Sequence, residues 1–493
     1  MSRSTATESA RIRAKLKHPI VDGDGHIVET GPVLLDYLKQ VGGSRLAKRY
    51  ETLMTKDGGP WGWYAMNAKE RRDWRAMRPP FWIMPARHTL DRATALLPNL
   101  MAERMDDFGI DYAIIYTSIG LPFVSLHDDE LRRGVCRALN VMYADLYRGH
   151  EYRLTPAALI PMHTPKEAIE ETEYAVKKLG LKAVMIAATV KRPVKALARK
   201  LGKHAHLAYW VDPLAIDSDY DYDPVWAKFV ELGVSPSAHS NSMGWGARAT
   251  TSNYMYNHIG HFAASGEAFA KALFFGGVTK RFPMLNVAFL EGGVAWACNL
   301  FSDIIEHWEK RSGRKMLKNL DPRRVDAAAL ADYYARYGGL MTNRLGASRG
   351  DATYGGSGAI DLKTMDEFAA ADVPTEEALY NRFVPNFYYG CEADDRMVAV
   401  AFNDRINHFG AKFKAMFSSD AGHWDVSNID RVVAQAHGLL EENLISDSDF
   451  RAFMFGNIVE QHGKMNPRFF QGTAVEAAAA KHLKVNGRQK RAA

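Results

Sequence analysis

The sequence predicts an α/β fold, a (β/α)8 TIM barrel with two insertions, and three observations support this prediction. Short apolar runs alternate with amphipathic segments of helical period, which is typical of parallel βαβ units. Eight such runs can be counted along the chain. Acidic residues and histidines follow four of them, at the strand ends where such a barrel builds its active site. The chain of 493 residues is long for one compact core but fits one barrel with large loop insertions.

The first unit starts with a short apolar strand at residues 19–21, and a helix is expected at 32–48. Residues 51–100 then form an excursion that is crowded with tryptophan and proline and too long for a simple connector. We interpret this first insertion as a lid that folds over the site. A small packed subdomain without substrate contact is the alternative.

The remaining units follow in order. Apolar, β-branched runs predict strands at 112–118, 154–162, 181–188, 235–240, 286–290, 386–391 and 415–419. Helical periodicity predicts helices at 100–108, 128–149, 164–180, 224–232, 265–276, 294–310 and 428–440, with a last helical segment at 446–455. Residues 164–167 form a capping box with proline at the first helical position, so one of these helices begins there.

A second insertion interrupts the alternation between the sixth and seventh strands. Residues 311–373 contain charged helices and a glycine-rich stretch at 346–358, and we interpret them as an oligomer contact or a second lid. The single barrel domain is assigned to residues 18–472. Residues 1–17 and 473–493 are interpreted as basic, flexible tails.

Composition excludes several classes of protein. The net charge of +6 comes partly from the two tails, so it does not indicate nucleic-acid binding. The three cysteines are far apart and show no CxxC spacing, which argues against a disulfide framework and a thiolate metal site. The N-terminus has no secretory signal, and no apolar run reaches the length of about 18 residues that spans a bilayer. We therefore expect a cytoplasmic protein without a membrane partner.

The end of the first strand carries a candidate metal site. If the strand continues, its alternation places Asp22, Asp24 and His26 on one side, where they can converge on a cation. Carboxylate oxygen and imidazole nitrogen together suit a divalent ion such as zinc or manganese. A plain Asp-Gly turn followed by a hydrogen-bonded histidine is the alternative.

Three further candidates follow later strands. His239 ends the fifth strand, Glu291 the sixth, and Asp420 follows the eighth. Taken alone, His239 fits a hydrogen-bonded core histidine and Asp420 fits a helix cap. Because strand ends of a barrel share one mouth, these side chains are expected to meet Asp24 and His26 around one cation.

The chain resembles the amidohydrolase-related family of metal-dependent TIM-barrel hydrolases, in the branch that includes aminocarboxymuconate-semialdehyde decarboxylase and resorcylate-type decarboxylases. The resemblance covers nearly the whole barrel. Its motifs, specific by their order and spacing, lie at 22–26, 104–111, 159–162, 281–283, 419–425 and 456–457.

The resemblance implies a role for each matching residue. Asp24 and His26 match the family's metal pair on the first strand, and His239 matches its fifth-strand histidine ligand. Asp420 matches the eighth-strand aspartate, which usually binds the metal and handles the proton of the metal-bound water. The implied cofactor is a divalent ion, zinc with manganese as the alternative.

One departure from the family concerns the sixth strand. Glu291 stands where the family commonly has histidine, and a carboxylate cannot donate a hydrogen bond to an oxyanion unless it is protonated. It is a metal ligand, a base or the partner of a cation. His258 and His261, one helical turn apart, are candidates for the missing imidazole, with ordinary polar surface as the alternative. Glu29 and His423 are expected to orient a ligand or to face the substrate.

Three functions are compatible with this sequence. The leading one is hydrolysis of an ester, amide, lactone or thioester of a bulky, largely apolar small molecule by metal-activated water, with Asp420, Glu291 and His261 as catalytic residues. The second is metal-dependent, non-oxidative decarboxylation of an aromatic or unsaturated carboxylic acid. The third is a non-catalytic barrel that binds a ligand. In each case we expect a homodimer or a larger homo-oligomer.

Overall fold

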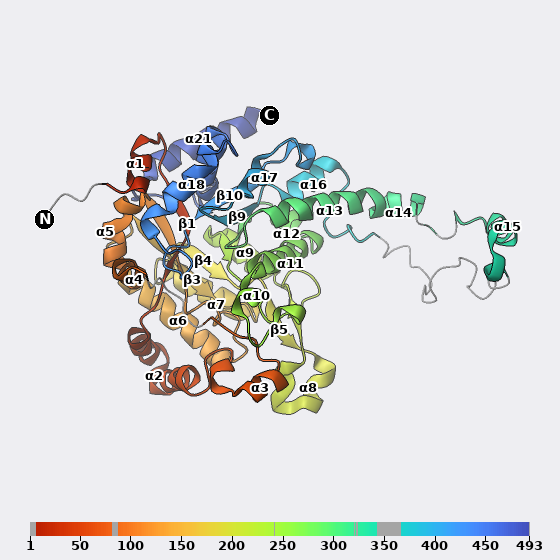
Figure 1. The fold of residues 1–493 in the computed structure, drawn as a ribbon. Coiled ribbons are helices and arrows are strands. Elements are labelled where there is room, and N and C mark those ends of the chain that lie inside the picture. Colours follow the sequence, from red (N-terminus) through yellow and green to blue (C-terminus); the bar gives the residue numbers. More distant parts are fainter. Residues whose placement is uncertain are drawn as a thin grey trace.

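A ring of eight parallel strands forms the centre of the molecule in a computed structural model, which describes residues 6–80, 87–240, 242–319, 321, 324–342 and 366–492 (Figure 1). In the order of their pairing, the strands are β1 (Val21–Ile27), β2 (Tyr112–Thr117), β3 (Leu154–Ile160), β4 (Ala183–Ile186), β7 (Pro236–Ala238), β8 (Val287–Phe289), β9 (Phe387–Glu392) and β10 (Lys414–Ser418). The chain just after β10 closes the ring on β1. The Asp420 amide donates to the Asp24 carbonyl at 2.9 Å, and the His26 amide donates to the Ala421 carbonyl at 2.9 Å. The predicted (β/α)8 barrel is confirmed.

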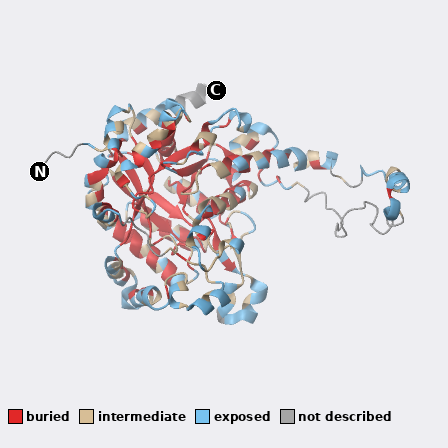
Figure 2. Cartoon of the chain, viewed as in Figure 1, coloured by how far each residue is buried: buried red, intermediate tan, exposed pale blue. Residues whose placement is uncertain are grey.

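Helices surround this ring, and the buried residues concentrate in the strands and on the helix faces turned toward them (Figure 2). The principal helices are α2 (Gly31–Thr55), α5 (Pro98–Phe108), α6 (Asp129–Leu146), α7 (Pro165–Lys177), α9 (Asp223–Leu232), α11 (His261–Phe275), α13 (Ala295–Arg311) and α18 (Val432–Glu441). The capping box at the start of α7 is present, with reciprocal hydrogen bonds between Thr164 and Glu167. Gly109 adopts φ 73° and ends α5.

A β-bulge in β1 changes which side chains face the barrel interior. Asp22 pairs with Ala113 of β2 and Gly25 with Ile115, so three steps along β1 match only two along β2. Asp22 consequently lies on the outer side, in a small cavity against Met101 of α5. The prediction that Asp22 shares one side with Asp24 and His26 is therefore wrong, because the extra residue breaks the strict alternation.

The first insertion contains η1 (Trp63–Ala65), α3 (Ala68–Asp73) and α4 (Thr89–Leu96), and its role as a lid stays a prediction. Hydrogen bonds fasten it to the loop that follows β7. The Trp63 indole donates to the Thr251 carbonyl at 3.0 Å, the Arg78 amide donates to the Thr250 carbonyl at 2.9 Å, and the Asn257 side chain donates to the Arg78 carbonyl at 3.1 Å. The first insertion and the loop after β7 therefore together cover the carboxyl ends of the strands.

Parts of the two predicted tails are helices joined to the barrel. In the first, α1 (Glu8–Lys15) is capped by Thr7 and held by an ion pair between Arg13 and Asp111. In the second, α21 (Glu476–Ala492) runs beside α20 (Asn457–Gly463), with His482 Nε2 at 3.3 Å from a carboxylate oxygen of Glu460. The interpretation of these residues as flexible tails is corrected accordingly.

The second insertion leaves the barrel as an arm. Beyond α13, α14 (Gly313–Asn319) continues outward and α15 (Ala327–Tyr337) lies away from the barrel in Figure 1. The glycine-rich stretch at 346–358 lies outside the described residues. The role of this insertion in oligomer formation stays a prediction. In the part of the chain that the structure describes, no helix combines the length and the apolar character needed to cross a membrane.

Candidate metal centre

Two potential metal ligands come from β1. Asp24 and His26 are fully buried at the carboxyl end of this strand. Nδ1 of His26 lies 3.0 Å from the Thr117 carbonyl, so this nitrogen carries the proton and Nε2 keeps its lone pair. Nε2 lies 3.4 Å from a carboxylate oxygen of Asp24 and 3.4 Å from one of Asp420. The imidazole is thus oriented to bind a cation between the two carboxylates.

Three other strands deliver ligands to the same point. Nε2 of His239, after β7, lies 3.4 Å from Nε2 of His26 and 3.3 Å from Oε2 of Glu291, after β8. Glu291 and Asp420 have φ values of 57° and 48°, in the left-handed region that residues other than glycine seldom adopt. Such strained positions concentrate at functional sites. The strand ends therefore bring together side chains from distant parts of the chain, as the sequence analysis predicted.

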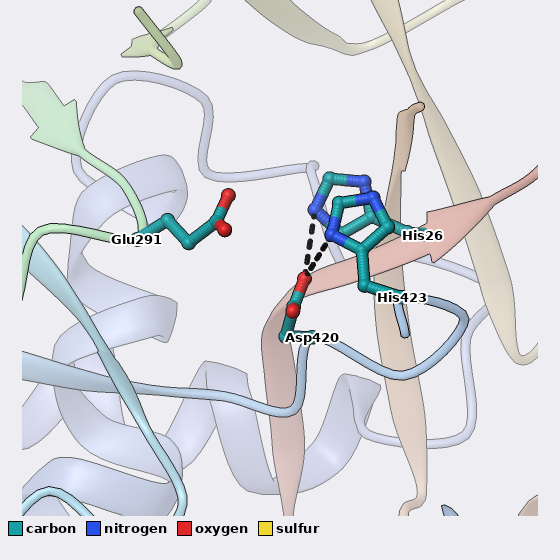
Figure 3. A group of neighbouring side chains, drawn as sticks. All are labelled: His26, Glu291, Asp420 and His423. Carbon is teal, nitrogen blue, oxygen red and sulfur yellow. Dashed lines mark ion pairs between the residues drawn. The ribbon is translucent and has the colours of Figure 1, made fainter. Parts of the chain in front are cut away.

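These side chains form two overlapping groups that could hold a metal ion. Within each group the candidate ligand atoms lie within 4.8 Å of one another. Ligands at about 2.0–2.2 Å from an ion require separations of this order. Figure 3 shows Asp420 paired with His26 and His423, while Glu291 points toward the same space from the other side. We call the two groups together the ligand cluster: Asp24, His26, His239, Glu291, Asp420 and His423.

The electrostatics of the ligand cluster fit a divalent cation. Both carboxylate oxygens of Asp24 and of Asp420 are buried without a hydrogen-bond partner, as is Oε2 of Glu291. Burial raises the pKa of these three carboxyls well above the ordinary value, and repulsion by neighbouring carboxylates raises it further. Burial lowers the pKa of His239 to about 3, which keeps its imidazole neutral and able to bind metal. A cation would bind these oxygens, which have no hydrogen-bond partner and whose burial is otherwise costly.

His423 belongs to the ligand cluster more directly than the sequence predicted. Its Nδ1 lies 2.7 Å from a carboxylate oxygen of Asp420, and its ring stacks on His26 at 3.7 Å between centroids. Its Nε2 lies 2.8 Å from Oγ of Ser118. Ser118 is not among the residues predicted from the sequence, although it directly follows β2, and catalytic groups occur just beyond barrel strands.

Glu29 supports the ligand cluster indirectly, through Thr117, which contacts His26. Its carboxylate accepts hydrogen bonds from the hydroxyls of Thr117 and Tyr143 and from the Ile119 amide at 2.8 Å. Its described hydrogen bonds do not include His26. Because the Thr117 carbonyl holds the His26 ring, the predicted orienting effect of Glu29 passes through Thr117.

His258 and His261 lie in the wall of a pocket beside the ligand cluster. The Tyr254 hydroxyl and Nε2 of His261 lie 2.8 and 3.1 Å from Nδ1 of His258. His261 is only 2% exposed, which excludes ordinary polar surface for this residue. Burial lowers the pKa of both histidines. Tyr254, which the sequence analysis did not identify, completes a polar chain in this wall.

The pocket itself is mainly apolar. Its cavity measures about 90 Å3, and Trp61 and Pro80 of the first insertion form part of its wall. None of its described lining residues is lysine or arginine. The lining residues are Trp61, Pro80, Ser118, Leu121, Pro122, His239, Met243, Tyr254, His258, His261, Phe262, Glu291, His423 and Trp424.

A protein-family model described as amidohydrolase matches residues 120–460. This chain belongs to the amidohydrolase family. The family resemblance inferred from the sequence is therefore confirmed, and the candidate ligands of this amidohydrolase lie at the strand ends where the resemblance placed them. A search of curated proteins finds no match.

Solved structures share the fold of this amidohydrolase. An amidohydrolase, map2389c from Mycobacterium avium subsp. paratuberculosis K-10, is 17% identical with a TM-score of 0.53, over 91% of this chain and 100% of that chain. A 2,6-dihydroxybenzoate decarboxylase in complex with 2,6-dihydroxybenzoate is 15% identical with a TM-score of 0.47, over 90% and 99%. A dihydroxybenzoic acid decarboxylase from Polaromonas sp. JS666, with manganese and the inhibitor 2-nitroresorcinol, is 14% identical with a TM-score of 0.48, over 92% and 99%. The likeness to the first of these structures concerns the fold alone.

Proposed function

We propose that this amidohydrolase is a metal-dependent hydrolase that cleaves an ester, amide, lactone or thioester of a neutral, largely apolar small molecule. One observation carries the proposal. The pocket beside the ligand cluster has mainly apolar walls and includes the carboxylate of Glu291, which belongs to the ligand cluster together with those of Asp24 and Asp420, and no lysine or arginine is among its described lining residues. A neutral carbonyl compound fits this environment, because its apolar part gains from burial and it carries no charge to be repelled.

The charge balance disfavours a carboxylic acid as substrate. If Asp24, Glu291 and Asp420 are all ionised, their three negative charges exceed by one the charge of a single divalent ion. A substrate carboxylate would then enter a site of net negative charge, in a poorly solvated cavity where like charges repel strongly. Glu291 is decisive here, because the histidine that the family usually has at this position would remove one of these charges.

Each group has a place in the proposed hydrolysis. Asp24, His26, His239 and Asp420 would hold a zinc or manganese ion. Bound there, such an ion lowers the pKa of a water molecule and polarises a carbonyl group. Asp420 and His423, with Nδ1 of His423 2.7 Å from a carboxylate oxygen of Asp420, would hold the proton that the attacking water gives up.

The other two predicted catalytic residues face the substrate side. Glu291 lines both the pocket and the ligand cluster, and we assign to it the exchange of a proton with the leaving group. His261 belongs to the polar chain in the wall of the same pocket, and we assign to that chain the binding of a polar atom of the substrate.

The proposal is tested with a substrate panel and a metal analysis. Purified protein is assayed against neutral esters and lactones and, in parallel, for carbon dioxide release from hydroxybenzoates. We expect ester or lactone turnover that a chelator removes and zinc or manganese restores, and no carbon dioxide release. Carbon dioxide release without ester hydrolysis would instead show a decarboxylase. Fewer than about 0.2 metal ions per chain, with unchanged thermal stability in chelator, would show a non-catalytic barrel.

A charge variant tests the argument about Glu291 separately. Glu291→Gln removes one negative charge with little change in shape. We expect benzoate to become a better competitive inhibitor of the variant by about tenfold, while the affinity for neutral benzamide stays nearly constant. Equal changes for the two inhibitors would contradict the electrostatic argument.

A further inference from the structure

Two neighbouring segments carry exposed apolar and basic side chains on the outside of the molecule. One is α3 of the first insertion with the residues just after it, and the other follows β4. Both come after the carboxyl ends of barrel strands, and α3 lies next to α8 in Figure 1. The rings of Trp74 and His204 lie 6.1 Å apart between centroids, so the two segments adjoin. The elements of the second segment are β5 (Val190–Pro193), α8 (Lys195–Leu201), η2 (Gly202–Leu207) and β6 (Tyr209–Asp212).

The exposed side chains of these segments form what we call the α3–α8 surface: Arg72, Trp74, Arg75, Leu197, Arg199, Lys200, Leu201 and Leu207. Among its large apolar side chains, Trp74 is 56% exposed and Leu207 is 50% exposed. Leu197 and Leu201 are also exposed, and because they are one helical turn apart they share a face of α8. Single exposed apolar residues are ordinary, but a group of them on adjoining segments indicates an interaction site.

The charge of the α3–α8 surface is positive. Residues 67–80 contain five lysines and arginines and two acids, and residues 189–211 contain six lysines and arginines and no acid. The loop at 212–223 is acidic, but three of its five aspartates form ion pairs. These pairs are Asp212–Arg192, Asp219–Lys195 and Asp223–Arg281. Positive charge therefore remains in excess around the exposed apolar side chains.

We propose that the α3–α8 surface binds the headgroup region of an anionic lipid membrane. Apolar side chains of such a surface enter the boundary between headgroups and acyl chains, while lysine and arginine are attracted to anionic headgroups. Tryptophan is enriched at the same boundary. The expectation of no membrane partner rests on the lack of a long apolar run in the sequence, and binding at the membrane surface does not require such a run.

The apolar side chains favour a membrane over a nucleic acid. Nucleic acids bind to surfaces that combine positive charge with aromatic rings, on which the bases stack. Leucine supplies three of the four large apolar side chains of the α3–α8 surface, and Trp74 is the fourth. An exposed leucine gains free energy when it leaves water for the acyl region of a lipid layer, whereas a nucleic acid offers it no comparable environment.

The α3–α8 surface adjoins the wall of the pocket. Trp61 and Pro80, which lie on either side of α3 in the sequence, line the cavity, as does Met243. The carbonyl of the next residue, Gly244, accepts a hydrogen bond from the Tyr209 hydroxyl at 3.1 Å, and β6 pairs with β5. An apolar substrate dissolved in the membrane would therefore reach the pocket with little passage through water. This role in substrate delivery rests on the proposed function, whereas the binding to lipid does not.

Vesicle binding tests the proposal directly. Full-length, metal-loaded protein is mixed with vesicles of equal parts phosphatidylglycerol and phosphatidylcholine, or of phosphatidylcholine alone, and the bound fraction is measured by sedimentation. We expect binding to the anionic vesicles, at least about tenfold weaker binding to the neutral ones, and loss of binding at about 1 M salt. No binding to the anionic vesicles, or equal binding to both kinds, would overturn the proposal.

Charge variants locate the binding. Arg199→Glu with Lys200→Glu should lower the affinity for anionic vesicles about tenfold or more. Lys177→Glu with Lys178→Glu makes the same change of net charge on exposed residues at the end of α7, which leads to the opposite end of the barrel, and should leave the affinity nearly constant. Equal losses in the two double variants would contradict a localised site. The comparison of the two lipid compositions on the unaltered protein remains decisive where a variant fails to fold.

A fluorescent label tests which side chains enter the lipid. The three native cysteines are buried, so a polarity-sensitive fluorophore can be attached to a new exposed cysteine. We expect the label on Leu201→Cys to shift to the blue with anionic vesicles, because it leaves water. The matched control is Met284→Cys, an exposed position just before β8 at the other end of the barrel, where we expect no shift. A shift at Met284 alone would place the membrane on the wrong face and overturn the proposal.

The outcomes separate this proposal from the proposed function. Vesicle binding by a protein that hydrolyses no ester or lactone would support the α3–α8 surface and contradict the hydrolase. Ester hydrolysis without vesicle binding would do the reverse. Retention on a duplex oligonucleotide in place of anionic vesicles would show that the positive charge serves a nucleic acid, and would overturn the assignment to lipid.

Discussion

Asp22 and Asp24 lie two residues apart in the same strand, are both buried, and have opposite surroundings. Asp22 accepts hydrogen bonds from the Ser419 amide at 2.9 Å, from the Ser419 hydroxyl and from the Asp24 amide at 3.1 Å. Asp24 has no hydrogen-bond partner for either oxygen. Asp22 thus joins β1 to the chain after β10 and closes the barrel, whereas Asp24 is left for a ligand that the chain itself does not provide.

The two pKa shifts express the same difference. Burial raises the pKa of Asp22 only to about 6, because the hydrogen bonds from Ser419 oppose it. The pKa of Asp24 rises well above its ordinary value through burial, and the nearby Asp22 and Glu392 add to this rise. A buried carboxylate without donors is unfavourable for folding, so its presence indicates a function rather than a structural role. The comparison therefore identifies Asp22 as a structural acid and Asp24 as a candidate metal ligand.

The largest expected effect comes from Asp420, whose two oxygens, like those of Asp24, are buried without a hydrogen-bond partner. Asp420→Asn keeps the size of the side chain but removes its charge and its ability to take up a proton. We expect kcat on a neutral ester to fall at least about 10^3-fold with an unchanged fold. Steady-state kinetics and circular dichroism check this, and retained activity would contradict the role assigned to Asp420.

A matched pair of substitutions in β1 comes next. Asp24→Asn removes a charged ligand and should weaken binding of zinc about 100-fold or more, measured by competition with a chelator. Asp22→Asn keeps an oxygen for the two amide donors and offers an amide to the Ser419 hydroxyl, so metal content should stay normal. Equal loss of metal in the two variants would remove the distinction between these residues.

The order of the strands and most of their positions could be predicted from apolar runs and helical periodicity, because a buried parallel strand is apolar on both faces. The exception within β1 has a definite cause. Strict alternation predicted Asp22 on the same side of the strand as His26. The bulge between Asp22 and Gly25 adds one residue, so the side chain of Asp22 points to the opposite side. The pattern of apolar and polar residues does not predict this bulge, because the bulge depends on hydrogen bonds to the chain that follows another strand.

The ligand cluster was predictable for the residues at strand ends and less so for those in loops. Asp24, His26, His239 and Asp420 follow apolar runs, and the barrel fixes where such positions meet. The Ser118–His423 hydrogen bond joins residues that are 305 positions apart in the chain, and it depends on the path of two loops. Loop paths follow from local turns and close backbone contacts, for which a single sequence gives little information.

The pH dependence of stability gives a third, smaller effect. Burial raises the pKa of Asp24, Glu291 and Asp420, so the folded protein without metal holds more protons than the unfolded chain. Stability from these groups is complete below about pH 4 and is lost as the pH rises toward their folded pKa values. The buried histidines, with lowered pKa values, oppose this trend only below about pH 6.5, where the unfolded chain becomes protonated.

We therefore expect the Tm of chelator-treated protein to fall between about pH 6.5 and 8.5, while the Tm of metal-loaded protein stays nearly constant. Asp24→Asn should reduce the slope of Tm against pH, because the variant lacks one carboxyl group with a raised pKa. Asp22→Asn should leave it unchanged, because the pKa of Asp22 of about 6 lies below the interval. Thermal melts at a series of pH values check both variants, and a slope that depends on Asp22 alone would reverse the comparison.

The smallest effect is expected at Glu29, which reaches the ligand cluster only through Thr117. Glu29→Gln disturbs the hydrogen bonds that hold the Thr117 hydroxyl and the Ile119 amide, but the Thr117 carbonyl that positions His26 remains. We expect metal affinity to fall about tenfold or less, and Thr117→Val to give a similar change because it breaks the same link. Chelator competition measures both variants. If Glu29→Gln lowered metal affinity as much as Asp24→Asn, the Glu29 carboxylate would act on the metal site directly. Glu29 would then be a ligand like Asp24 and not a residue that supports a ligand.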